Sequence, residues 1–283
     1  MVPKHPRSVP GVATLLPRLA VMVRRQSLEL DPGSHPLAPG INAFNRGNGW
    51  YRAVLGRPDR SEWIGLAELS GDVAEVDRRI TQLERVYGGH AGYAAASLIQ
   101  QVAHPLLSLT AWCSLVGSGI PDISPGAVWL RQHPQGLFDR VAISGEPAYV
   151  ESGDESATTI GKTIVASLNP LIESIRSARK VGLAGVWHGV SDLIARTFMG
   201  AAATLGSVET GVAAAEAILT GAPDVIRVTP RWHVDRATGM WFSLRSVCCL
   251  AYTGTLRLYC DTCPLLDDEK ITSRLASNQA GAL

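Results

Sequence analysis

Four of the five cysteines of this chain lie close together near its C-terminal end. Cys248 and Cys249 are adjacent, ten residues follow, and Cys260 and Cys263 then form a C-x2-C pair. Thiolates are soft ligands that suit zinc and iron–sulfur clusters, so this spacing predicts a metal centre. The C-x2-C half is a short chelating loop, in which the two intervening residues let both sulfurs turn toward one metal.

The adjacent pair favours a two-iron cluster over a single zinc ion. In an extended strand neighbouring side chains point to opposite faces, so both sulfurs reach one centre only if the backbone bends at Cys248–Cys249. A [2Fe-2S] cluster relaxes this demand because its ligands are shared between two metal atoms. Zinc sites usually place about two to four residues within each ligand pair. Structural zinc remains an alternative, as does a Cys260–Cys263 disulfide.

Other familiar catalytic patterns are absent from the sequence. The seven histidines show no H-x3-H or H-E-x2-H spacing, and no GxxxxGK[ST], GxGxxG after a strand, or GxSxG is present. These absences argue against a separate zinc enzyme, a nucleotide site and a serine hydrolase. The fifth cysteine, Cys113, lies in the apolar run Ala111–Leu115 and is predicted to be a buried core thiol.

The surroundings of the four cysteines carry a family resemblance. Arg245 precedes the adjacent pair, Tyr252 follows it, and Pro264 follows the C-x2-C pair. With the ten-residue spacer, this pattern resembles the ferric-siderophore reductases of the FhuF type. A weaker likeness extends from about Gly92 onward and includes the Trp-containing segment 184–189.

The resemblance implies that Cys248, Cys249, Cys260 and Cys263 are the ligands of a [2Fe-2S] cluster. Members of this family reduce the ferric ion of imported hydroxamate-type chelates in the cytoplasm. One position departs from the family pattern, because Asp261 stands where many members carry glycine. This difference leaves open the backbone shape of the C-x2-C loop, since glycine enters positive φ more readily.

The implied task is the transfer of one electron. Ferric ion in a siderophore is a hard cation held by hard oxygens, and the ferrous ion that one electron produces is held far less tightly. Arg245 and Arg257 flank the cysteines, and positive charges there would favour the reduced form of a cluster. For both arginines, a solvent-facing surface charge is the alternative reading.

The chelate and the electron donor have to come from outside the chain. Candidates for the wall of a chelate site are Trp187, His188, Trp232 and Trp241, with core packing as the alternative for each. The sequence holds no nicotinamide or flavin motif, so we expect an external donor such as a ferredoxin or a flavin reductase. Two other functions stay open: a non-enzymatic protein with structural zinc, and a cluster-bearing redox sensor.

Composition limits the class of protein. The chain has 283 residues, of which 46% are hydrophobic and 18% charged, and this excludes disorder over most of its length. A net charge of +1 without a long basic tract argues against nucleic-acid binding. No unbroken apolar stretch suits a membrane span, and Pro17–Arg18 interrupts the apolar run expected of a signal peptide. The odd, clustered cysteines suit a reducing cytoplasm.

Hydrophobic periodicity predicts an α+β fold that is mostly helical, with small antiparallel strands or hairpins and a C-terminal iron–sulfur-binding segment. Helices are expected at 72–87, 92–116, 156–180, 183–205 and 208–219. Strands are expected within 127–144, around the turn Pro134–Gly136, and at 225–234 and 240–247. We therefore divide the chain into a poorly determined N-terminal region (1–60), a helical α+β body (61–240), a [2Fe-2S]-binding segment (241–270) and a mobile tail (271–283).

Overall fold

A computed structural model describes residues 31, 33, 35–59, 61–88, 90–133, 138–145, 147, 154–235, 238–255 and 259–280. Its helices are α2 (Ala38–Gly47), α3 (Leu66–Gly71), α4 (Val73–Tyr87), α5 (Ala91–Leu115), α6 (Asp154–Ala178), α7 (Leu183–Thr204), α8 (Val208–Gly221) and α9 (Asp268–Ala280), with short 3-10 turns at Pro125–Ala127 and Ala251–Thr253. Its strands are β1 (Arg52–Leu55), β2 (Trp63–Gly65), β3 (Val128–Gln132), β4 (Phe138–Ile143), β5 (Arg231–Val234) and β6 (Trp241–Leu244).

The predicted fold class, a mostly helical α+β protein, is confirmed, and the five predicted helices correspond to α4 through α8. Helix α4 illustrates why the pattern is readable. The apolar residues Val76, Ile80 and Leu83 recur at helical spacing and are all buried. The Asp72 carboxylate caps the first turn by accepting a hydrogen bond from the Glu75 N–H, and Gly88 in the left-handed conformation ends the helix.

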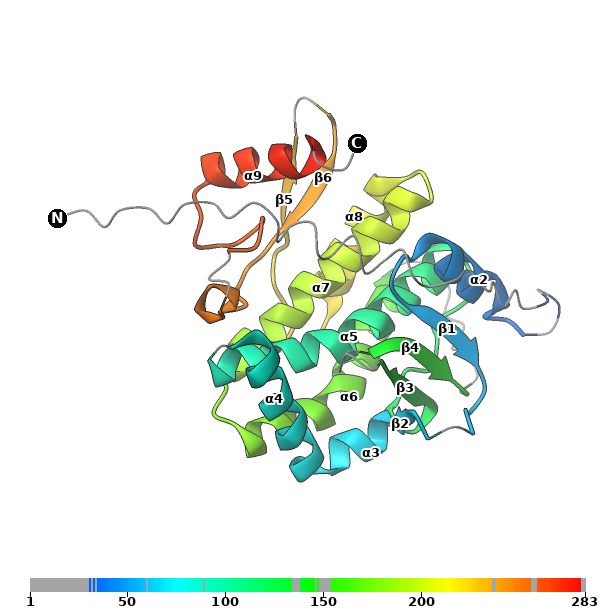
Figure 1. Ribbon diagram of the computed structural model, residues 1–283. Coiled ribbons are helices and arrows are strands. Elements are labelled where there is room, and N and C mark those ends of the chain that lie inside the picture. The colour runs from blue at the N-terminus through cyan, green and yellow to red at the C-terminus, as the bar shows by residue number, and fades with distance from the viewer. Residues whose placement is uncertain are drawn as a thin grey trace.

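Two long helices, α5 and α7, pack against each other in the middle of the molecule (Figure 1). Their apolar residues are buried on most sides, and Trp187 and Phe198 of α7 are among the largest fully buried side chains. Helix α5 continues through Pro105. Cys113, near its end, is fully buried in the same core, as predicted. In the described part of the chain, no helix combines the length and apolarity needed to cross a membrane.

The larger sheet is mixed, where the sequence predicted only antiparallel strands. Its strand order is β1-β4-β3-β2, and β1 runs parallel to β4 while the other neighbours are antiparallel. Strands β3 and β4 lie where two strands were predicted, whereas β1 and β2 were not predicted. The turn Pro134–Gly136 lies outside the described residues.

The N-terminal region is better ordered than its composition indicates, from residue 35 onward. Leu37, Ile41 and Phe44 are fully buried against the main core, and β1 pairs along β4 through Ala53 and Val141. The division at residue 60 was therefore wrong for this part, because its many Pro and Gly residues hid one short amphipathic helix and one edge strand. Residues 1–30 lie outside the described part.

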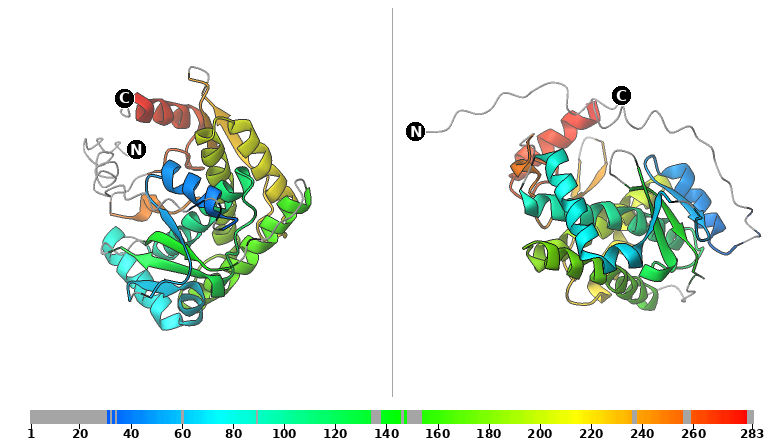
Figure 2. Two further views of the ribbon diagram at one scale, coloured as in Figure 1. Left: turned by 90° about the vertical axis from the view of Figure 1, so that its right-hand side faces the viewer. Right: turned by 60° about the horizontal axis from the view of Figure 1, so that its bottom comes forward.

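The C-terminal part forms a unit at one end of the molecule, apart from the four-stranded sheet (Figures 1 and 2). Strands β5 and β6 form the predicted antiparallel hairpin. Ile271 and Leu275 of α9 are buried against Leu244 of β6 in a small second core. The expectation of a mobile tail at 271–283 was therefore wrong up to Ala280, because two apolar residues at helical spacing hold α9 on the hairpin. Residues 281–283 lie outside the described part.

Candidate metal centre

Asp192 of α7 fixes the stretch that leads into the first two cysteines. Its carboxylate accepts hydrogen bonds from the backbone N–H of Ser246 (2.8 Å), the Ser246 hydroxyl (2.7 Å) and the Val247 N–H (3.4 Å). The Arg245 Nε lies 4.0 Å from the same carboxylate. Burial raises the pKa of Asp192, although the bonds from Ser246 act against this shift. A carboxylate of the body thus positions residues 245–247.

A second anchor lies beyond the adjacent pair, where the segment meets the end of α4. The Thr255 N–H and its hydroxyl both donate to the Tyr87 carbonyl oxygen, at 2.9 and 3.1 Å. Gly88 has φ +56, and a Cβ there would lie 1.7 Å from the Thr255 hydroxyl oxygen. Glycine is therefore needed at this position both for the helix end and for the close approach of the cysteine segment.

The backbone bend expected at the adjacent pair occurs one residue later. Leu250 has φ +63 and ψ +12 and is the only non-glycine residue with positive φ in the described part of the chain. This conformation costs a branched residue about 1–2 kcal/mol. The bend brings the Leu250 N–H to 3.4 Å from the Cys248 sulfur. Asp261 has no positive φ, so it fits its loop without the freedom of glycine.

The structure brings the four predicted cysteines together as two pairs, and each pair takes one residue from each half of the motif. The Cys249 and Cys260 sulfurs lie 3.7 Å apart. Cys248 and Cys263 are close enough to interact electrostatically. All four are free thiols. In the described residues, no three Cys, His, Asp or Glu side chains converge closely enough to hold a single ion.

The separation of Cys249 and Cys260 fits a shared metal atom. Two metal–sulfur bonds of about 2.3 Å at a tetrahedral angle place the sulfurs about 3.8 Å apart. The observed 3.7 Å needs almost no adjustment to reach that geometry. Four thiols arranged in two pairs suit a centre with two metal atoms, which was the reason that the spacing favoured a cluster over a single zinc.

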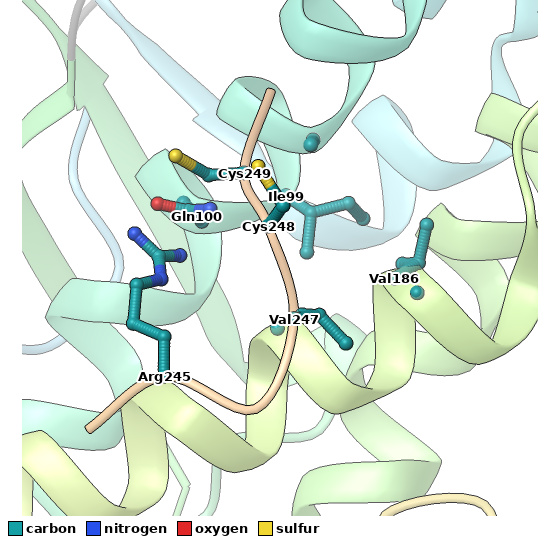
Figure 3. Close-up of a pocket in the computed structure, with 10 residues that line it drawn as sticks. Ile99, Gln100, Val186, Arg245, Val247, Cys248 and Cys249 are labelled. Atoms are coloured by element: carbon teal, nitrogen blue, oxygen red, sulfur yellow. The ribbon is translucent and has the colours of Figure 1, made fainter. Parts of the chain in front are cut away.

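Arg245 lies against the first of these pairs. Its Nη1 donates toward the Cys260 sulfur at 3.9 Å, and its side chain is only 12% exposed. Figure 3 shows its guanidinium extending toward Cys249 and Gln100. Burial disfavours the charge, but the sulfurs of Cys249 and Cys260 outweigh it and raise the pKa of Arg245. The surface-charge reading was therefore wrong for Arg245, and Arg257 lies outside the described residues.

The metal-free pair shares one proton. The hydrogen bond from Cys260 lowers the pKa of Cys249 to about 5; burial opposes this shift and the charge of Arg245 supports it. The same bond raises the pKa of Cys260. At neutral pH the pair therefore consists of a thiolate and a thiol. The thiolate is the form that binds a metal, so Cys249 is already in the state that a metal ligand requires.

A small hollow of about 20 Å³, partly open to solvent, adjoins the adjacent cysteines (Figure 3). Gly185 and Gly189 of α7 form one wall, and a Cβ at either position would meet no other atom within 4 Å. Gln100 and Ile99 of α5 form the opposite wall. Arg245, Val247, Cys248, Cys249, Ala96 and Val186 complete the lining.

The four residues predicted to line a chelate site differ in how deeply they are buried. Trp187 is 2% exposed and belongs to the core, so the packing alternative is correct for it. The Trp232 indole N–H donates to the Glu216 carboxylate at 2.8 Å, and its ring packs against the main core. His188 and Trp241 are half-buried. None of the four lines the hollow beside the cysteines.

Sequence reasoning missed Asp192 and Arg196, and also the Tyr51–His104 pair that interacts electrostatically with Arg196. A signal was available, because Asp192 and Arg196 are the only Asp, Glu, Lys or Arg residues in the otherwise apolar helix α7, and they lie one turn apart. Tyr51 Oη lies 3.1 Å from His104 Nδ1, with the two rings perpendicular. No sequence signal joined Tyr51 to His104, which are 53 residues apart.

A scan against protein-family models finds no match to this chain, and a search of curated proteins finds no similar sequence. The family likeness described above therefore rests on the cysteine motif and its neighbours, with the weaker likeness from about Gly92 onward.

Proposed function

We propose that Cys248, Cys249, Cys260 and Cys263 hold a [2Fe-2S] cluster, and that the protein uses it to reduce a ferric siderophore, of the hydroxamate type, and so releases ferrous iron in the cytoplasm. The observation that carries the proposal is the 3.7 Å separation of the Cys249 and Cys260 sulfurs, one from each half of the motif. Free thiols held this close, in a motif with four of them, favour a metal centre over isolated buried thiols.

When bound, such a cluster supplies one electron at a time, which is the chemistry that ferric release needs. The protein residues have separate tasks around it. Asp192 holds the backbone of residues 246 and 247, and Arg245 directs positive charge at Cys260. That charge partly offsets the negative charge of four thiolates, and so favours acceptance of an electron. Electrons have to reach the centre from an external donor of the ferredoxin or flavin reductase class.

Ferrous release tests this function. Protein purified without oxygen is reduced and mixed with a ferric trihydroxamate in the presence of a coloured ferrous trap. We expect stoichiometric formation of the ferrous complex, and none with protein that lacks iron. Absence of ferrous release from every ferric chelate tried, by protein that does contain the cluster, would contradict the reductase proposal and favour the redox sensor. A colourless protein with stoichiometric zinc would favour the structural alternative.

A further inference from the structure

Arg196 of α7 is a charged side chain within electrostatic reach of Cys260. Arg196 is exposed to solvent, although its helix α7 is buried on most sides. Among the described residues it makes no hydrogen bond or close ion pair, and it interacts with Asp192, Tyr51 and Cys260 only through longer-range electrostatics, while the nearby Arg245 has both Asp192 and Cys260 as partners. An exposed arginine without a hydrogen-bond partner in the described part of the chain has its guanidinium donors available for a ligand.

Arg196 lies on the same side of α7 as the residues that hold the cysteine segment. It follows Asp192 by one helical turn, and residues four apart share a face of a helix. Cys260, Arg245 and Tyr51 are all within its electrostatic reach. Desolvation by the surrounding protein and the charge of Arg245 lower the pKa of Arg196. The residue is thus exposed at the surface, while the surrounding protein desolvates its guanidinium near Cys260.

The same face of α7 leaves space for a ligand. Gly185, Gly189 and Gly200 share a helical face with Asp192 and Arg196, and apart from the helix's own backbone no atom lies within 4 Å of the position of a Cβ at any of the three. Glycine inside a helix costs about 1 kcal/mol relative to alanine, and here no neighbouring backbone requires it. The hollow at Gly185 and Gly189 includes Arg245, which is also a neighbour of Arg196.

We infer that Arg196 is a substrate-contact residue, which donates hydrogen bonds to the oxygens of a ferric chelate bound along α7 on the Cys249–Cys260 side. This inference rests on the proposed function. The substrate class is a ferric ion enclosed by hydroxamate oxygens, since a guanidinium presents a rigid fork of donors to oxygen acceptors. Cys260, which is half-buried, lies on this side, whereas Cys263 of the other pair is 1% exposed.

The reaction itself gives Arg196 a larger effect on the product than on the substrate. The external donor loses one electron, and the chelated Fe(III) gains it and becomes Fe(II), with no bond to carbon made or broken. A neutral ferric trihydroxamate therefore becomes an anion with one negative charge. A guanidinium at its edge stabilises the anion more than the neutral complex, and this difference lowers the barrier to transfer.

A redox-inert probe separates binding from electron transfer. Ga(III) trihydroxamate has the charge and shape of the ferric complex but cannot be reduced, so calorimetric titration measures its binding alone. We expect Arg196→Gln to bind it about 10- to 100-fold more weakly than the unaltered protein, with an unchanged cluster spectrum. Arg196→Lys should recover part of the loss. Arg176→Gln, which changes another exposed helical arginine, should bind normally.

The outcomes are distinct. If the unaltered protein and Arg196→Gln bind the gallium complex equally, the role of Arg196 is wrong while the proposed function stands. If the unaltered, cluster-containing protein binds no gallium chelate and releases no ferrous iron, the proposed function fails first. Weaker binding in Arg176→Gln of the same size would also overturn the inference, because it would show a general effect of positive charge.

Discussion

The helical body and the cysteine segment are held in place by different forces. The body surrounds one continuous apolar core that includes residues from α2 through α8 and from the larger sheet. The C-terminal unit has only Leu244, Ile271 and Leu275 as its buried core. It is attached to the body by hydrogen bonds to Asp192 and to the Tyr87 carbonyl, and by the Trp232 ring, which packs against the main core. Within the unit, Arg274 of α9 donates to the Tyr259 carbonyl at 2.8 Å.

The body has a large apolar core to stabilise its fold, whereas the proposed cluster would add ligand bonds to a cysteine segment whose own buried core is small. Metal ligation often contributes folding free energy in small segments of this kind. The strained φ of Leu250 lies in the segment and not in the body. Strain of about 1–2 kcal/mol persists where other bonds hold the backbone, and a metal centre would supply such bonds.

The largest expected effect is the loss of one ligand. Cys260→Ser should lose the colour of the cluster and much of its soluble yield, because the segment then has neither its ligand bonds nor a large core. Absorbance and iron content of oxygen-free preparations measure this. Cys113→Ala is the matched control in the body: it should keep its iron but lower the free energy of unfolding by about 1–2 kcal/mol. Unchanged absorbance in Cys260→Ser contradicts the ligand assignment.

A smaller effect is expected at the contact between the two regions. Asp192→Asn keeps an oxygen for Ser246 but removes the charge opposite Arg245, so we expect a loss of about 1–3 kcal/mol in the free energy of unfolding and faster loss of iron to a chelator. Urea denaturation and chelator kinetics measure the two effects. Asp224→Asn is the control, since Asp224 is 88% exposed and should change neither quantity. If Asp192→Asn and Asp224→Asn show the same free energy of unfolding and the same rate of iron loss, Asp192 does not hold the cysteine segment in place.

A pH-dependent effect is expected within the body, at His104. Burial, followed by the charge of Arg196, lowers its pKa from 6.5 to about 3 in the folded protein. Below pH 6.5 the His104 imidazole binds a proton in the unfolded chain but stays neutral in the folded protein. The free energy of unfolding therefore falls as the pH decreases toward 3. Between pH 7 and pH 5.5 this costs about 1 kcal/mol.

His104→Gln should remove that part of the pH dependence while leaving a hydrogen-bonding group opposite Tyr51. Urea titrations of both proteins at a series of pH values provide the comparison. If the two proteins lose stability in parallel on acidification, His104 is not the neutral, buried group described here.

The smallest expected effect concerns Cys113, which we expect not to react with a thiol-alkylating reagent. Burial raises the pKa of Cys113 to about 12, so its thiol stays protonated and enclosed at pH 8. Iodoacetamide should label the cysteine segment of metal-free protein under native conditions and leave Cys113 unlabelled, as peptide mass spectrometry can determine. Rapid labelling of Cys113 would show that the body opens as easily as the segment.

The sequence predicted the parts of the fold that depend on local pattern. Helices α4 through α8 have strong apolar periodicity, and the four cysteines are neighbours in sequence as well as in space. The pairing of β1 with β4 could not be predicted, because a four-residue edge strand carries little local pattern and is stabilised by a partner that is distant in the sequence. The role of Asp192 was hidden for the same reason, since it is 54 residues from the Ser246 that it binds.

The most direct test of the central claim is an iron and acid-labile sulfide analysis of oxygen-free protein, with electron paramagnetic resonance after reduction by dithionite. A [2Fe-2S] cluster on the four cysteines gives about two irons and two sulfides per chain, and a signal from one unpaired electron in the reduced form. Protein that carries neither iron nor sulfide, or one zinc per chain and no signal, would contradict it.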